Sequence, residues 1–139
     1  MIYVASRASV PERPSLWKRL RAEGWPITST WIDEAGVGET ADLNELWTRI
    51  EAEIRAASCL ILYAEYNDFP LKGAFIECGM AIGMGKPVAV VLDFVPEAHN
   101  CAPIGSWIKH PLVSVHATVE EARQFLEHIV ARGGKENKQ

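Results

Sequence analysis

The 139-residue chain is poor in the residue types that mark several large classes of protein. Its three cysteines, Cys59, Cys78 and Cys101, are widely spaced and form no CxxC pair, which argues against a disulfide framework or a zinc site. No stretch approaches the roughly 20 apolar residues of a membrane helix, and the first apolar run is too short for a signal peptide. We therefore expect a cytoplasmic protein without a membrane partner.

The chain also lacks a basic excess. Its formal net charge of −4 argues against extended nucleic acid as the main ligand, because surfaces that bind a phosphate backbone are usually basic. No GxGxxG motif is present, so the fingerprint of a dinucleotide site is missing. His110 and His116 do not have metal-ligand spacing, and we expect neither a metal nor a cofactor.

Five short apolar runs alternate with helical patterns along the chain. We predict strands at residues 2–5, 26–32, 59–64, 88–92 and 112–115, and helices at 14–23, 42–57, 118–132 and around Glu77. This alternation predicts one α/β domain over residues 1–132, built on a doubly wound, five-stranded parallel sheet with helices on both faces. Residues 133–139 are polar, and we expect them to be a disordered tail.

Ligands of such sheets bind at the carboxyl ends of the strands. Ser6 and Arg7 follow the first predicted strand, where a hydroxyl and a guanidinium suit a phosphate or a sugar hydroxyl. Near the second strand, Trp31 could stack on a base and Asp33 could hydrogen-bond to it. A plain polar loop at the first position and a core tryptophan at the second are the competing interpretations.

The polar, proline-containing stretch at residues 93–111 is expected to be a functional loop or lid. It contains Asn100 and Ser106, which we count as binding residues because this loop could close over a ligand, including a ligand of a neighbouring subunit. His99 has no serine or cysteine nucleophile at a matching spacing, so we do not expect a hydrolase triad.

Glu77 gives the clearest chemical signal in the chain. In a helix its neighbours three and four positions away are Gly73, Ala74, Met80 and Ala81, and a lone acid on such a face is costly to bury unless it is used. A carboxylate there could attack a carbon that bears positive charge, such as the anomeric carbon of a sugar. The competing interpretation is a partly exposed helix acid that makes a cap or a salt bridge.

Three segments, residues 2–6, 77–81 and 85–87, carry a pattern typical of one enzyme family. They are Ile-Tyr-Val-Ala-Ser, Glu-Cys-Gly-Met-Ala and Gly-Lys-Pro. On these segments, residues 1–93 resemble the nucleoside 2-deoxyribosyltransferases and the related deoxynucleoside 5′-monophosphate N-glycosidases.

This resemblance implies a flavodoxin-like sheet and a homodimer or larger homo-oligomer in which a partner subunit completes the active site. It implies that Glu77 is a nucleophile that forms a glycosyl-enzyme intermediate. It also implies that Tyr3 orients Glu77, while Ser6 contacts sugar or phosphate.

We therefore predict cleavage or transfer at the N-glycosidic bond of a small (deoxy)nucleoside or nucleotide. An acid near the base, Asp68 or Asp33, would assist its departure. Lys72 and Gly73, which precede the Glu77 helix, complete the predicted binding residues.

The alternative is a non-catalytic protein that binds a nucleotide or a nucleotide-derived signal in the same cleft. Ile50 and Leu71 support this alternative, because they occupy the positions at which the family carries polar residues that contact sugar, base or phosphate.

Overall fold

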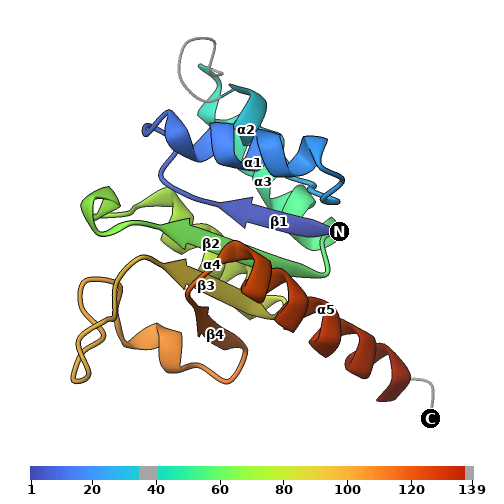
Figure 1. The fold of residues 1–139 in the computed structure, drawn as a ribbon. Coiled ribbons are helices and arrows are strands. Elements are labelled where there is room, and N and C mark those ends of the chain that lie inside the picture. Colours follow the sequence, from blue (N-terminus) through green and yellow to red (C-terminus); the bar gives the residue numbers. More distant parts are fainter. Residues whose placement is uncertain (35–40, 137–139) are drawn as a thin grey trace.

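A computed structural model describes residues 1–34 and 41–136 as an α/β fold around one parallel sheet (Figure 1). The sheet contains four strands in the order β1-β2-β3-β4, namely β1 (Ile2–Ala5), β2 (Cys59–Ala64), β3 (Val88–Leu92) and β4 (Val113–His116). The helices are α1 (Glu12–Ala22), α2 (Trp31–Glu34), α3 (Leu43–Ala56), α4 (Gly73–Gly83) and α5 (Val119–Glu136), with short 3-10 turns η1 (Tyr66–Asp68) and η2 (Ser106–Lys109).

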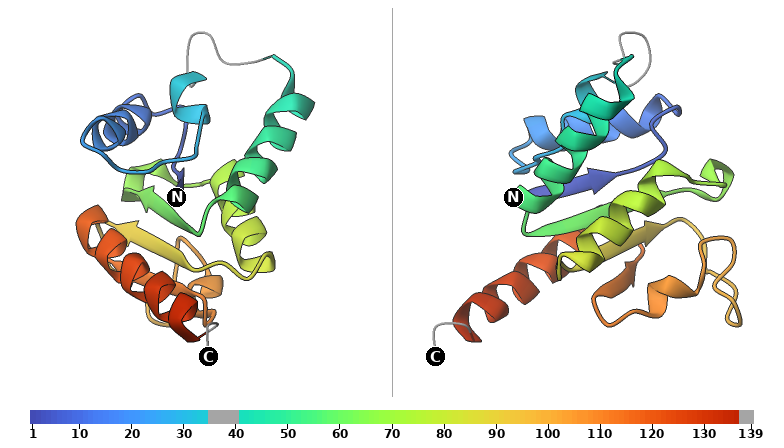
Figure 2. Two further views of the ribbon diagram at one scale, coloured as in Figure 1. Left: turned by 90° about the vertical axis from the view of Figure 1, so that its right-hand side faces the viewer. Right: turned by 180° about the vertical axis from the view of Figure 1, so that it is seen from behind.

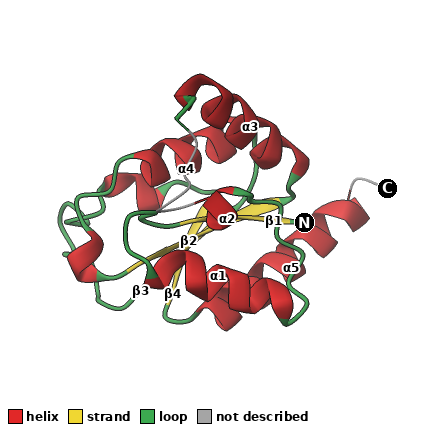
Figure 3. Ribbon diagram, turned by 90° about the horizontal axis from the view of Figure 1, so that it is seen from above, coloured by secondary structure: helices red, strands yellow, loops and turns green. Residues whose placement is uncertain are grey.

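Helices cover both faces of the sheet. α1 and α5 lie on one face, and α3 and α4 lie on the other (Figure 2). Seen from above, the strands run between these two helix layers (Figure 3). A strand covered on both sides has no solvent face, which explains why β3 is an unbroken apolar run with every residue buried. The prediction of helices on both faces is confirmed, as are the strands at 2–5, 59–64 and 88–92.

The prediction of a fifth strand at residues 26–32 is wrong for most of that segment. It contributes a single parallel bridge, from Ile27 to Ile2, and its last residues begin the short helix α2. The structure therefore has a four-stranded sheet, with residues 26–30 lying along the outer edge of β1.

Side chains replace the missing strand at the edge of β1. The backbone N–H of Val4 donates to Ser29 Oγ at 2.7 Å, and the Val4 carbonyl accepts from Trp31 Nε1 at 2.7 Å. Buried backbone N–H and C=O groups require hydrogen-bond partners. Both groups of Val4 thus find partners although no continuous strand pairs with this edge of β1. The segment resembles a strand in sequence because it is rich in apolar and β-branched residues, of which Ile27 and Thr28 are half-buried and Trp31 and Ile32 are buried.

The helix boundaries follow recognisable end signals. Asp42 caps α3 by accepting from the backbone N–H of Glu45 at 3.0 Å. α5 continues past the predicted end at Arg132 to Glu136. Asp33 and Glu34 belong to α2, while residues 35–40, like 137–139, lie outside the described residues. Among the helices of the described ranges, none has the length and apolar character needed to cross a membrane.

Lys86 ties the ends of α3 and α4 together. Its ammonium donates to the carbonyls of Ile54 at 2.9 Å, Ala57 at 2.5 Å and Arg55, which lie at the carboxyl end of α3. Gly85 precedes it with a φ of 76°, the left-handed conformation that ends many helices. The Gly-Lys-Pro segment therefore fixes the spacing of the two helices.

Replacing Lys86 with methionine is expected to lower the free energy of unfolding by about 2 kcal/mol, because a charged donor to several carbonyls is lost. Urea unfolding measures the change. Lys109→Met is the matched control, since Lys109 is exposed on η2, and its effect should be close to zero. Equal stability of the two variants would contradict the tethering role.

Candidate active site

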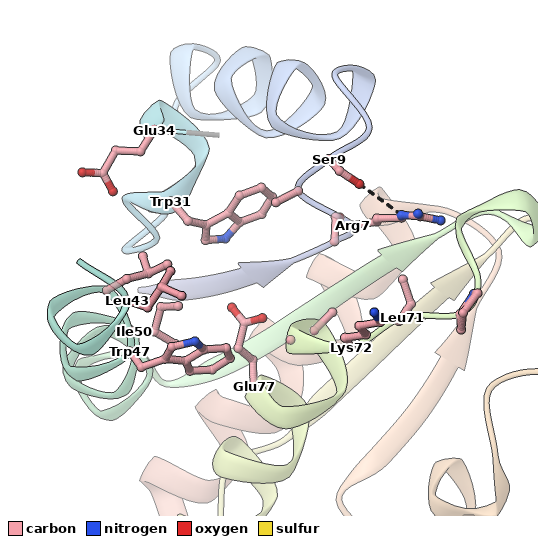
Figure 4. Close-up of a pocket in the computed structure, with 16 residues that line it drawn as sticks. Arg7, Ser9, Trp31, Glu34, Leu43, Trp47, Ile50, Leu71, Lys72 and Glu77 are labelled. Carbon is pink, nitrogen blue, oxygen red and sulfur yellow. Dashed lines mark hydrogen bonds between the residues drawn. The ribbon is translucent and has the colours of Figure 1, made fainter. Parts of the chain in front are cut away.

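A cavity of about 430 Å³ opens at the carboxyl end of β1, between α2, α3 and the start of α4 (Figure 4). One part of its wall is apolar and comes mainly from α3. The other part is polar and comes from α2, from α4 and from the segments after β1 and before α4. The apolar lining includes Trp31, Leu43, Leu46, Trp47, Ile50 and Leu71, and the polar lining includes Ser6, Arg7, Ser9, Glu34, Lys72 and Glu77.

Glu77 stands on the floor of this cavity. Its side chain projects from α4 toward the space between Trp31 and Trp47 (Figure 4). One carboxylate oxygen, Oε1, accepts a hydrogen bond from the hydroxyl of Tyr3, which is fully buried on β1. The other oxygen, Oε2, has no hydrogen-bond partner among the described residues. It is also not one of the unpaired polar atoms in those residues that are fully shielded from solvent. Glu77 therefore presents one held oxygen and one oxygen open to the cavity.

Burial changes the acidity of Glu77. The residue is 7% exposed, and loss of hydration raises its pKa to about 8. The hydrogen bond from Tyr3 lowers that pKa, and the negative charge of Glu53 raises it. Burial also raises the pKa of Tyr3, so its phenol keeps the proton and acts as the donor. Glu77 is therefore mostly protonated at pH 7.

Gly73 allows an aromatic side chain to pack over the start of α4. A Cβ at this position would lie 3.3 and 3.4 Å from two ring atoms of Trp47, and 3.9 Å from Glu77 Oε2. The absence of a side chain thus lets Trp47 approach the nucleophile candidate. Trp47 is a cavity residue that the sequence did not reveal, because the apolar side of α3 forms part of the cavity wall.

The polar end of the cavity carries two positively charged side chains and one hydroxyl group that already has hydrogen-bond partners. Ser6 donates to the Tyr63 carbonyl at 2.9 Å and accepts from Trp17 Nε1 at 2.9 Å, so its hydroxyl is already paired. Arg7 donates to Ser9 Oγ at 3.1 Å and to the backbone carbonyl of Asp68 at 3.0 Å. Lys72 lines the cavity, and no described carboxylate forms an ion pair with it.

The structure does not bring Asp68 to the cavity, contrary to the prediction of a catalytic acid. Arg13 binds its carboxylate with two hydrogen bonds, at 2.8 and 3.0 Å, and the backbone N–H of Glu65 adds a third at 2.9 Å. Burial alone would raise the pKa of Asp68, but these hydrogen bonds outweigh burial and the pKa is lowered. Asp68 is therefore an ionised structural group that holds η1 against α1.

Four other predicted site residues also lie outside the cavity lining, although one of them, Tyr3, contacts the lining residue Glu77. Asp33 faces solvent and is bound by Arg21 at 2.7 and 2.9 Å. Asn100 accepts from the backbone N–H of Ala102 at 2.9 Å, and Ser106 begins η2 in the same loop. The loop at 93–111 thus contributes no residue to this cavity, whereas six other residues chosen from the sequence do line it, namely Ser6, Arg7, Trp31, Lys72, Gly73 and Glu77.

Glu34 is a cavity residue that the sequence did not reveal. Its Oε2 lies 2.6 Å from Arg49 Nη2, as an ion pair without an aligned hydrogen bond. Arg49 also pairs with Glu45, one turn earlier on α3, at 2.9 Å. Glu34 and Arg49 lie 15 positions apart in the sequence, so no local pattern predicts their contact. Within residues 1–34 and 41–136, no group of three or more His, Cys, Asp or Glu side chains is arranged to hold a metal ion.

The pKa of Glu77 gives a test of its burial that does not depend on any activity. Its folded-state pKa of about 8 lies above the ordinary 4.5, so between these values the folded protein keeps a proton that the unfolded chain has lost. The free energy of unfolding should therefore fall as pH rises through this window, by up to about 1.4 kcal/mol per pH unit.

Urea unfolding of wild type and Glu77→Gln between pH 5 and 9 measures this slope. The difference in stability between the two proteins should change across the window and become level above pH 8. Parallel curves for the two proteins would show that Glu77 is not buried as described.

Asp68→Asn is expected to lower the free energy of unfolding by about 2 kcal/mol, because the buried Arg13 would lose the nearer of its two carboxylate partners and keep only Glu65, at 3.2 Å. Asp33→Asn is the matched control, since the same substitution at an exposed ion pair should cost less than about 1 kcal/mol. Urea unfolding distinguishes them, and similar losses would contradict the structural role given to Asp68.

Comparison with known proteins provides no relative from which a function can be transferred. No protein-family model, curated protein or solved structure matches this chain.

Proposed function

We propose that the protein cleaves, or transfers a sugar at, the N-glycosidic bond of a nucleoside or nucleotide, with Glu77 as the nucleophile. The observation that carries this proposal is the buried Glu77 carboxyl group, with one oxygen held by Tyr3 and the other open to the cavity. The cavity volume of about 430 Å³ falls within the range of small-molecule sites.

The resemblance of the N-terminal strand and the Glu77 helix to the nucleoside 2-deoxyribosyltransferases supports the same assignment. The arrangement of the strands supports this assignment too, since the segment around Ile27 lies beside β1 on the side away from β2. We propose that the fold is flavodoxin-like, with this segment in the place of the second strand.

The reaction would proceed in two displacements at the anomeric carbon. In the first, Glu77 Oε2 forms a bond to that carbon while the bond to the base nitrogen breaks. In the second, water or another base attacks the same carbon and releases the carboxylate. A carboxyl group fixed through its other oxygen is suited to this role, because little orientation is lost as the bond forms.

Tyr3 would act through Glu77 rather than on the substrate. Its hydroxyl donates to Oε1, which stabilises the charged form of the carboxylate and offsets part of the effect of burial. Because only the ionised carboxylate is a nucleophile, activity should rise with pH through the Glu77 pKa of about 8.

The two walls of the cavity suit the two ends of a nucleoside or nucleotide. Trp31 and Trp47 offer flat apolar surface for a ring, and Arg7 and Lys72 suit hydroxyls or a phosphate. A sugar placed between these ends would bring its anomeric carbon over Glu77, which stands between the two walls in Figure 4.

Incubation with a panel of nucleosides and 5′-monophosphates, followed by chromatography for free base, tests the proposal. We expect release by wild type and a loss of at least about 10⁴-fold in Glu77→Gln, since a covalent step is removed. Glu120→Gln, an exposed acid on α5, is the matched control and should retain activity. Ligand-induced thermal stabilisation without release from any compound would instead favour the non-catalytic binding protein.

Tyr3→Phe is expected to move the inflection of kcat/KM against pH above the wild-type value of about 8, because a hydrogen bond that lowers the Glu77 pKa is lost. Activity at pH 7 should fall by about tenfold for each unit of that shift and recover at higher pH. A loss that is the same at every pH would contradict the orienting and pKa-lowering role of Tyr3.

A further inference from the structure

The cavity offers no described acid that is free to protonate a leaving group. A neutral base leaves with a negative charge on its nitrogen unless an acid supplies a proton. Asp68 and Asp33, which the sequence suggested for this task, are each bound by an arginine and lie outside the cavity lining. Among the residues that line the cavity, the carboxyl groups are those of Glu77 and Glu34.

Neither of these two carboxyl groups suits proton donation. Glu77, as the nucleophile, must itself give up its proton before it can react. Glu34 is ion-paired with Arg49 at 2.6 Å, and an ion pair requires the carboxylate form. Glu34 is therefore an ionised carboxylate whose charge is partly balanced by Arg49, and it has no proton to donate.

The distribution of charge and aromatic surface adds a positive argument. Trp31, Trp47 and Glu34 lie toward one end of the cavity, and Arg7 and Lys72 lie toward the other (Figure 4). Faces of tryptophan rings attract cations, most strongly when water is excluded. The aromatic end, which also carries a carboxylate, is thus suited to a flat cation, while the opposite end is suited to an anion or to hydroxyls.

We propose that the natural leaving group is a positively charged aromatic ring. This inference rests on the proposed function and narrows its substrate class to N-glycosides such as N-ribosyl pyridiniums or N7-alkylated purine nucleosides. The cationic ring lies against Trp31 and Trp47 near Glu34, and the hydroxyl or phosphate end of the sugar lies toward Arg7 and Lys72.

The chemical step then balances without an acid. The bond from Glu77 Oε2 to the anomeric carbon forms, the carbon–nitrogen bond breaks, and its electron pair neutralises the departing ring. Water then attacks the anomeric carbon, which restores the Glu77 carboxylate and releases one proton to solvent. The positive ring also favours ionisation of Glu77 when it binds, because an opposite charge nearby lowers the pKa of a carboxyl group.

The experiment compares 7-methylguanosine with guanosine, and nicotinamide riboside with uridine, in the ribo and the 2′-deoxy series. Release of the base by Glu77→Gln is subtracted to remove spontaneous hydrolysis. We expect kcat/KM for the cationic compounds to exceed that for the neutral ones by at least about 100-fold, the lower range of what general acid catalysis supplies. A smaller ratio, with release still dependent on Glu77, overturns this inference and leaves the proposed function standing. No Glu77-dependent release from any compound overturns both.

A pair of glutamate variants tests the place of the cation. Glu34→Gln is expected to raise KM about tenfold for the cationic compounds, with little change for the neutral ones. Glu45→Gln is the matched control, because Glu45 also pairs with Arg49 but does not line the cavity. Equal effects of the two substitutions, or equal effects on cationic and neutral compounds, would contradict the placement of the ring near Glu34.

Discussion

The hydrogen bond from Tyr3 to Glu77 joins the first strand to the fourth helix beneath the cavity, and the arrangement of the site depends on it. Tyr3 is fully buried on β1, so the position of its hydroxyl is set by the sheet. Gly73 lets Trp47 pack against the start of α4. Lys86, just after the end of α4, donates hydrogen bonds to the carboxyl end of α3. Strand, helix and cavity wall are thus positioned relative to one carboxyl group.

That carboxyl group is subject to two opposing requirements. Burial favours its neutral form and raises the Glu77 pKa to about 8, whereas nucleophilic attack requires the ionised form. Tyr3 supplies part of the compensation within the protein. A cationic leaving group would supply more at the moment of binding, and it would also remove the need for an acid, a role for which the structure leaves Asp68 unsuited. The positive charge of the ligand would therefore offset the raised pKa of Glu77 and would also account for the lack of a proton donor among the described residues of the site.

Much of the fold and the central site residue could be predicted from the sequence, because both depend on local patterns. Apolar runs and helical spacing identified the strands and helices, and an acid on a small apolar face identified Glu77. The failures involve contacts between distant parts of the chain. Arg13 binds Asp68 across 55 residues, and Ser29 and Trp31 use side chains to pair the edge of β1, where the sequence suggested a strand. The homo-oligomer implied by the family resemblance stays a prediction.

Trapping the covalent intermediate tests the central claim most directly. A reaction with a nucleoside substrate is quenched in acid during the first turnover. The masses of the intact protein and of its proteolytic peptides are then measured by mass spectrometry. The account predicts an adduct with the mass of the glycosyl group on the peptide that contains Glu77, absent from Glu77→Gln. Release of base with that peptide unmodified, or an adduct on another residue, would contradict it.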